Sequence, residues 1–357
     1  MKLNIISFTK LCLVIAILIS SSTGTSGQTT TPQDSKSMNS ILLKPWIGPY
    51  GGVPPWRQVN RDEFLGAFDA AIEISNQEIE AIANNPDPPT FENTFVALEK
   101  SGKTLNRLQT IFDVHTSNLA TGPIPDIEKA VAPKMSKFSD SIIQNSKLFA
   151  RIEAIYQGDE MNSLSVSQKR LVKDRYDSFV RQGAKLNDKD KAVLSQKNAA
   201  LAGLFADFSQ KVLSDEEGYI TWIDDAEMLA GLPASTVAAM AGAADKLGDA
   251  NNPKGKWCVT NTRSSMEPFL TYADNRGLRE AVWRNYYNRG DNGGDNDTNA
   301  IISAILKLRA ERALLLGYKT HAHWRLEPQM AGTPEAAMDL MLKVWPKAVA
   351  RVKEEVA

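Results

Sequence analysis

The sequence contains few of the residue types and none of the short motifs that commonly mark an active site. Its 357 residues include 2 Cys and 3 His. It has no His-Glu-x-x-His, no Gly-x-Ser-x-Gly, no phosphate-binding glycine loop and no cysteine pair at metal-binding spacing. The formal net charge of -1 argues against a strongly basic nucleic-acid binder. Residue types and local motifs therefore do not identify a reaction.

Long apolar runs are also scarce, and the one near the N-terminus predicts a secretory signal peptide over positions 1–27. Lys2 and Lys10 are positive, Leu11–Ile19 is apolar, and Ser20–Gly27 is small and polar. A short membrane anchor is the alternative, although the run is too short to cross a bilayer comfortably. The signal predicts an exported protein, located in the periplasm.

Export has a consequence for the cysteines. Cleavage of the signal removes Cys12 and leaves Cys258 alone, so no intramolecular disulfide is possible. Cys258 lies between Trp257 and Val259 in a strand-like run, and we interpret it as a buried apolar residue, not a nucleophile.

The region after the signal predicts a flexible linker over positions 28–44, because most of it is rich in Thr, Ser and Gln. Positions 45–56 contain too many Pro and Gly for a helix, yet include Trp46, Tyr50 and Trp56. We expect an extended arm that buries these aromatic rings against the body.

Helical periodicity dominates the rest of the chain and predicts a mainly α fold with one small β pair. The expected strands are 218–223 and 256–261, which should pair. A helix that begins at Thr333 still shows its apolar pattern at Ala357. The expected helices are 61–84, 90–117, 127–145, 147–156, 165–181, 187–214, 233–247, 278–290, 298–317 and 333–357.

Two charged clusters lie around residues 276–297. Arg276, Arg279, Arg284 and Arg289 could hold an acidic partner or a substrate carboxylate, but an ion-paired, solvated helix face is the favoured interpretation. Residues 291–297 (Asp-Asn-Gly-Gly-Asn-type acidic loop, read as DNGGDND) resemble a calcium loop only superficially, because the closing Glu is missing. We expect a turn between two helices with an acidic cap.

The three histidines are the remaining candidates for chemistry. His321 and His323 have a spacing that could place two imidazoles on one side of an extended segment, but no third ligand stands at a convincing distance. His115 is alone on a helical stretch, where a structural role is expected. We assign no catalytic residue and no metal ligand to this sequence, and its substrate-binding residues stay unknown.

Several blocks, in order, resemble the M3 group of zinc oligopeptidases, which includes oligopeptidase A and the peptidyl-dipeptidases (dipeptidyl carboxypeptidases). The blocks run from about Leu42 to the last residue. The proline- and glycine-rich arm and the predicted export favour the peptidyl-dipeptidase branch. The most specific blocks are Ile82–Gly102 (IANNPDPPTFENTFVALEKSG), Leu278–Gly290, Leu308–Tyr318 (LRAERALLLGY) and Met330–Pro334 (MAGTP).

The resemblance implies a two-lobed, mainly helical zincin-type oligopeptidase that hydrolyses short peptides by releasing C-terminal dipeptides. It implies one zinc ion on a His-Glu-x-x-His helix plus a later Glu, a motif absent from this sequence. Positions 45–265 are then an N-terminal helical domain that forms a channel wall or lid. Positions 266–357 are the start of the peptidase domain, truncated before the zinc motif.

The resemblance leaves one alternative open. In the first hypothesis, the catalytic half of the same enzyme is the missing partner, and this chain alone is inactive. In the second, the chain is a complete, catalytically inactive helical protein that binds peptides. The DNA beyond codon 357 distinguishes them, because only the first hypothesis expects an open frame that encodes the zinc motif. Neither hypothesis includes nucleic acid, or a membrane after signal removal.

Overall fold

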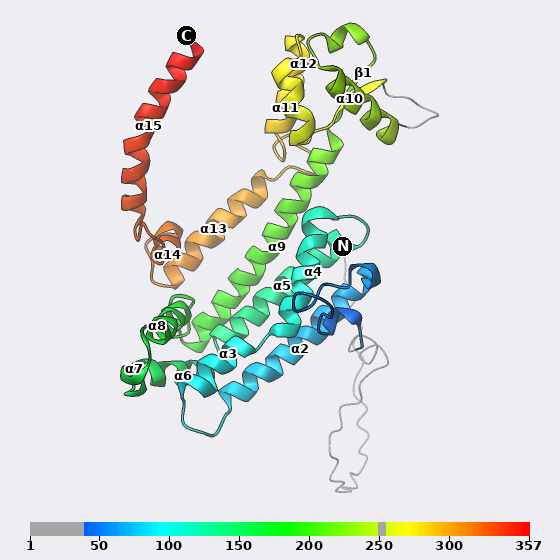
Figure 1. Cartoon of the computed structure of the whole chain (residues 1–357). Helices are drawn as coiled ribbons and strands as arrows, with labels where there is room; N and C mark the ends of the chain where they lie inside the picture. The colour runs from blue at the N-terminus through cyan, green and yellow to red at the C-terminus, as the bar shows by residue number, and fades with distance from the viewer. Residues whose placement is uncertain (1–38, 249–254) are drawn as a thin grey trace, which may run out of the picture.

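The computed structural model of the chain describes residues 39–248 and 255–357 (Figure 1). The predicted signal peptide and most of the predicted linker lie outside these residues. The described chain is mainly helical with one pair of short strands, which confirms the predicted fold class. Within the described ranges, none of the helices has the length and apolar character needed to cross a membrane.

A first core forms where the N-terminal segments pack together. Phe64 and Phe68 meet Phe112 edge to face, with ring centroids 5.0 and 5.1 Å apart. Leu42, at the end of the predicted flexible linker, is instead fully buried in this core. The contributing elements are η1 (Ile41–Leu43), η3 (Arg61–Glu63), α2 (Phe64–Ala83), α4 (Lys103–Asn118) and α5 (Ile124–Ile143).

The arm at 45–56 buries less than the sequence predicts. Trp46 packs against the first core, but the side chain of Tyr50 is 99% exposed and that of Trp56 is 47% exposed. The arm turns back on itself through a bridge between Ile47 and Val53, and Tyr50 lies at the tip with a φ of 60°. The turn directs Tyr50 away from the body, so its expected burial was wrong. The short η2 (Trp56–Gln58) follows.

A second core lies at the opposite end of α2, and there the expected single helix over 90–117 is broken. Gly102 adopts a left-handed φ of 71°, and its N–H donates to the carboxylate of Glu78 at 2.6 Å. The chain therefore stops and restarts one turn later. The elements here are η4 (Phe91–Val96), α3 (Ala97–Lys100), α6 (Ser146–Gln157), α7 (Glu160–Ser163) and α8 (Val166–Arg181).

The longest helix, α9 (Asp188–Gly218), joins the helical body to a smaller module (Figure 1). Its start agrees with the predicted Asn187 cap, whose side chain accepts from the N–H of Asp190 at 3.0 Å. Helices α5 and α13 (Asn299–Leu315) pack along α9. Because α13 returns along α9, the two ends of the module meet near residue 215.

The module has its own core around the fully buried Phe269. Strands β1 (Thr221–Ile223) and β2 (Trp257–Val259) pair antiparallel with Trp222 opposite Cys258, so the predicted pairing is confirmed. Cys258 is buried and free, as expected, and burial raises the pKa of its thiol. The other module elements are η5 (Ala226–Leu229), α10 (Ala234–Leu247), α11 (Arg263–Tyr272) and α12 (Arg276–Tyr287).

The chain ends in two further helices. Helix α14 (His321–Leu326) packs against α13, and α15 (Pro334–Val356) begins beside α14 and then stands apart from the rest of the molecule (Figure 1). The predicted Thr333 cap is confirmed, since its side chain accepts from the N–H of Ala336 at 3.1 Å. None of the 23 residues of α15 is buried.

Candidate functional site

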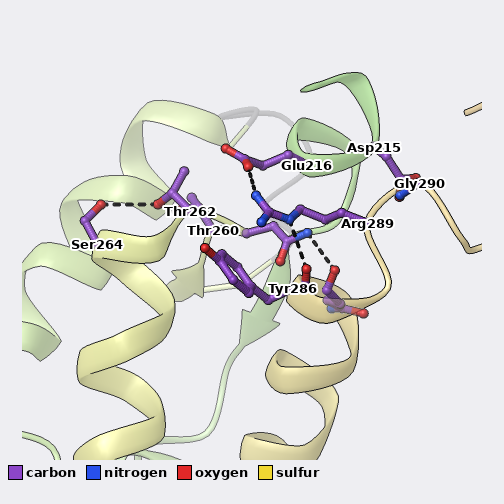
Figure 2. Close-up of polar contacts among 10 residues, drawn as sticks. Asp215, Glu216, Thr260, Thr262, Ser264, Tyr286, Arg289 and Gly290 are labelled. Carbon is purple, nitrogen blue, oxygen red and sulfur yellow. Dashed lines mark hydrogen bonds and ion pairs between the residues drawn. The ribbon is translucent and has the colours of Figure 1, made fainter. Parts of the chain in front are cut away.

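The most connected polar cluster joins the end of α9 to the loop between α12 and α13 (Figure 2). Asp215 is 3% exposed, and its carboxylate accepts from the N–H of Gly290 at 2.7 Å and from the Asn292 amide at 2.9 Å. Thr298 closes the loop, because its hydroxyl donates to the Gly290 carbonyl at 2.9 Å. We call Asp215, Gly290, Asn292 and Thr298 the junction cluster.

Gly290 is required at the junction by its backbone conformation and by the space around it. Its φ is 76°, and a Cβ there would lie 2.9 Å from the Thr298 hydroxyl and 3.4 Å from a methyl of Val212. The sequence predicts a helix stop at Gly290. The structure adds that the close approach to α9 also excludes a side chain.

The Arg cluster does not converge on a ligand site. Arg284 pairs with Glu280 at 2.8 Å, and Arg289 pairs with Glu216 while its guanidinium lies 4.0 Å from the centroid of the Tyr286 ring (Figure 2). Arg279 donates to the backbone carbonyls of Ala273 and Asp274. Ion pairing along the helix therefore accounts for most of the cluster, as favoured.

The acidic loop 291–297 acts as the expected helix cap. Asp297 accepts from the N–H of Asn299 at 2.8 Å, at the start of α13, and this hydrogen bond lowers the pKa of its carboxyl. Asp295 accepts from Lys211 of α9 through its backbone carbonyl, not its carboxylate. The carboxylates of the loop thus serve the turn.

The histidines occupy separate, structural positions. His115 is buried against Phe64 with ring centroids 5.3 Å apart, as expected for a structural residue. His321 and His323 lie on the short helix α14, not on an extended segment, so the expected local conformation was wrong. His323 contacts the Thr320 hydroxyl at 2.8 Å and Glu335 at 3.6 Å.

These residues do not fit zinc. Across residues 39–248 and 255–357, no group of three or more His, Cys, Asp or Glu side chains could hold a metal ion. The ring of His321 lies beside Trp324, with centroids 5.5 Å apart, and near three arginines that repel a cation. We therefore derive no catalytic step through a metal in this chain.

Two buried charged residues escaped the sequence analysis. Arg151 is 6% exposed and donates to the Asn85 carbonyl at 2.9 Å and to the Asn93 side chain at 2.7 Å. Asp140 of α5 is 9% exposed and accepts from the Asn198 amide of α9 at 2.7 Å. Their partners are remote in sequence, so local patterns gave no signal beyond the rarity of charge on a buried helix face.

Comparison with known proteins places the chain in a family. Residues 269–357 match the sequence model of peptidase family M3. The chain belongs to peptidase family M3. It is similar to the dipeptidyl carboxypeptidase of Escherichia coli (strain K12), with 33% identity over 321 residues, which covers 90% of this chain and 46% of that protein.

Other M3 relatives give the same coverage. The dipeptidyl carboxypeptidase of Salmonella typhimurium is 32% identical, over 88% of this chain and 46% of its own length. Oligopeptidase A of Escherichia coli is 26% identical, also over 88% of this chain and 46% of its own length. The chain therefore spans about half the length of the curated relatives it matches. The division predicted at 265/266 stays a prediction.

His321 should make the stability of the M3 chain depend on acid pH. Burial, and then Arg309, Arg312 and Arg325, lower the pKa of His321 from 6.5 to about 4. Because the unfolded chain binds this proton first, stability is full above pH 6.5 and falls as pH drops toward 4. We expect a loss of about 1–2 kcal/mol after allowance for solvent screening.

Urea unfolding at pH 7 and pH 4.5 measures this loss. His321→Gln should reduce the difference between the two pH values, whereas His323→Gln should retain the contribution of His321. An unchanged pH difference in His321→Gln would contradict the assignment.

Proposed function

We propose that this chain is the N-terminal half of an exported zinc metallopeptidase that releases dipeptides from the C-termini of short peptides. Support for this substrate class comes from the two dipeptidyl carboxypeptidases at 33% and 32% identity. Export follows from the signal pattern at positions 1–27. The helical body would form a wall or lid of the peptide channel.

The observation that carries the proposal is the open face of α15. This helix lies within the residues that match family M3, yet its large apolar side chains have no covering partner among the described elements. Trp345 is 67% exposed and Leu342 is 60% exposed. An apolar face of this extent marks an interaction surface. The other exposed members are Met338, Leu340, Met341, Val344, Val352 and Val356.

We assign the cover of α15 to the second half of the same enzyme. The relatives are about twice as long as the matched region, which leaves room for that half. It would also supply the zinc ligands and the general base, because the described residues of this chain offer no metal site. Peptide substrate would then lie between the two halves.

The chain by itself should not hydrolyse peptides. The expected result is no release of dipeptide from a short blocked peptide above background, with or without added zinc, as followed by mass spectrometry. A full-length M3 relative assayed in parallel provides the positive control. Cleavage by this chain that a chelator abolishes and zinc restores would refute the proposal.

Reading the DNA beyond codon 357 tests the division of labour directly. An open frame with His-Glu-x-x-His supports a two-half peptidase. A stop codon at that point would instead favour a helical peptide-binding protein without catalysis.

A further inference from the structure

A second polar cavity lies where α13 and α14 cross the α5–α9 pair, remote from the junction cluster. Its volume is about 280 Å³. One wall carries Asp140 from α5, the opposite wall carries Arg312 from α13, and Asn198 of α9 lies between them. Trp324 and Phe205 supply the apolar sides. We call this space the α5–α13 cavity.

The carboxylate and the guanidinium in this cavity are not directly paired. The Asn198 amide donates to Asp140 Oδ1 at 2.7 Å, and the Asn198 carbonyl oxygen accepts from Arg312 Nη1 at 3.0 Å. Asp140 Oδ2 and Arg312 Nε are both buried and have no hydrogen-bond partner among the described residues. A buried charged group without its full set of partners is costly, so the cavity offers one acceptor and one donor to an occupant.

Positive charge exceeds negative charge around Arg312. Arg309, Arg312 and Arg325 lie close enough together to act on His321, while Asp140 is the acid that acts on Arg312. The guanidinium of Arg312 lies 4.6 Å from the centroid of the Trp324 ring, which fixes its plane. An anionic group beside Arg312 would therefore be stabilised by charge and by a pre-oriented donor.

The acidic wall has the opposite preference. Asp140 is nine-tenths buried, and desolvation raises the pKa of its carboxyl despite the nearby Arg312. A cation placed at Oδ2 would replace the hydration that burial removes. The Ser136 and Ser139 hydroxyls line the same side and can accept hydrogen bonds from an ammonium group.

We propose that the α5–α13 cavity binds a small zwitterion of amino-acid type, with its ammonium at Asp140 and its carboxylate at Arg312. The two free atoms lie on opposite walls, as the two charged ends of such a molecule require. The volume lies near the lower end of the range for ligand pockets, about 300–1,000 Å³, which limits the ligand to a free amino acid or a dipeptide. The apolar walls accept an aliphatic side chain. This site does not depend on the proposed peptidase activity.

Isothermal titration of the chain with L-leucine and with L-alanyl-L-leucine tests the site and separates its two sources of ligand. Saturable binding of either zwitterion is expected, and the tighter one identifies the source. N-acetyl-L-leucinamide, which lacks both charges, should bind at least about tenfold more weakly, since two charge-assisted hydrogen bonds are lost. Equal binding of the blocked compound, or no binding of either zwitterion, would overturn the proposal.

Substitutions locate the binding in the cavity. Asp140→Asn and Arg312→Gln should each weaken the tighter ligand about tenfold or more. Arg309→Gln is the matched control, because it removes the same charge one turn earlier on α13 without lining the cavity. Should a charge variant fail to fold, Ala202→Leu fills the cavity from α9 and should also abolish binding. Undiminished binding in the folded Ala202→Leu protein would place the ligand elsewhere and refute the assignment.

Discussion

Replacement of Arg151 by methionine is expected to lower the free energy of unfolding by about 3 kcal/mol. The guanidinium of Arg151 is the centre of the second core. It donates to the backbone carbonyls of Asn85 and Asp87 at 2.9 and 3.1 Å, and to the side chains of Thr94 and Asn93 at 3.3 and 2.7 Å. Methionine keeps the apolar stem but donates no hydrogen bond, so the buried acceptors lose their partner.

The position of these acceptors explains the size of the effect. The Asn93 side chain that Arg151 holds also accepts from the N–H of Thr90, and so completes the capping box at the start of η4. Thr94 is fully buried, so water cannot easily replace the lost donor. Loss of Arg151 should therefore loosen residues 85–96 as well as destabilise the whole fold.

Urea unfolding and hydrogen exchange over residues 85–96 provide the measurement. Arg175→Met is the matched control, because Arg175 pairs with Glu99 while both side chains are about half exposed, at 48% and 47%. That control should cost less than about 1 kcal/mol. Equal losses in the two variants would show that the Arg151 contacts do not contribute as the geometry implies.

Asp215→Ala is expected to cost about 2–3 kcal/mol and to release the loop at 288–298. The change removes the acceptor of the buried Gly290 N–H and of the Asn292 amide. Because Gly290 cannot move away without breaking its contacts to Thr298, its N–H would remain buried without a partner.

Limited proteolysis and hydrogen exchange at residues 288–298 measure the release, and urea unfolding measures the stability. Glu280→Ala is the control, since it removes an acid whose partner Arg284 is exposed on α12. It should change stability by about 0.5 kcal/mol or less. An unchanged exchange rate at Gly290 in Asp215→Ala would contradict a role for the junction cluster in fixing α13 on α9.

Local sequence features predicted most elements of this chain. The caps at Ser165, Asn187 and Thr333 form as expected, because each needs only a side chain and an N–H a few residues away. The Gly290 stop and the acidic cap at Asp297 follow from the same short-range chemistry. The expected break at Gly102 was missed, since the helical pattern continues on both sides of it.

The polar sites could not be predicted in this way. Asp140 and Asn198 are 58 positions apart, Asn198 and Arg312 are 114 apart, and Asp215 and Gly290 are 75 apart. Side chains this remote meet only after α5 and α13 pack along α9. The exposure of Tyr50 was likewise decided by the direction of the arm, not by the apolar character of the ring.

The sequence by itself determined the helical class, the helix caps and the relation to family M3, because each is written in short stretches of neighbouring residues. The tertiary structure decided that the Arg cluster is consumed by ion pairs and backbone carbonyls, and that α15 keeps an uncovered apolar face. It also decided which buried charges lack partners, as in the α5–α13 cavity. The physical reason is that burial and pairing depend on what packs against a residue, and that is fixed only when distant helices meet.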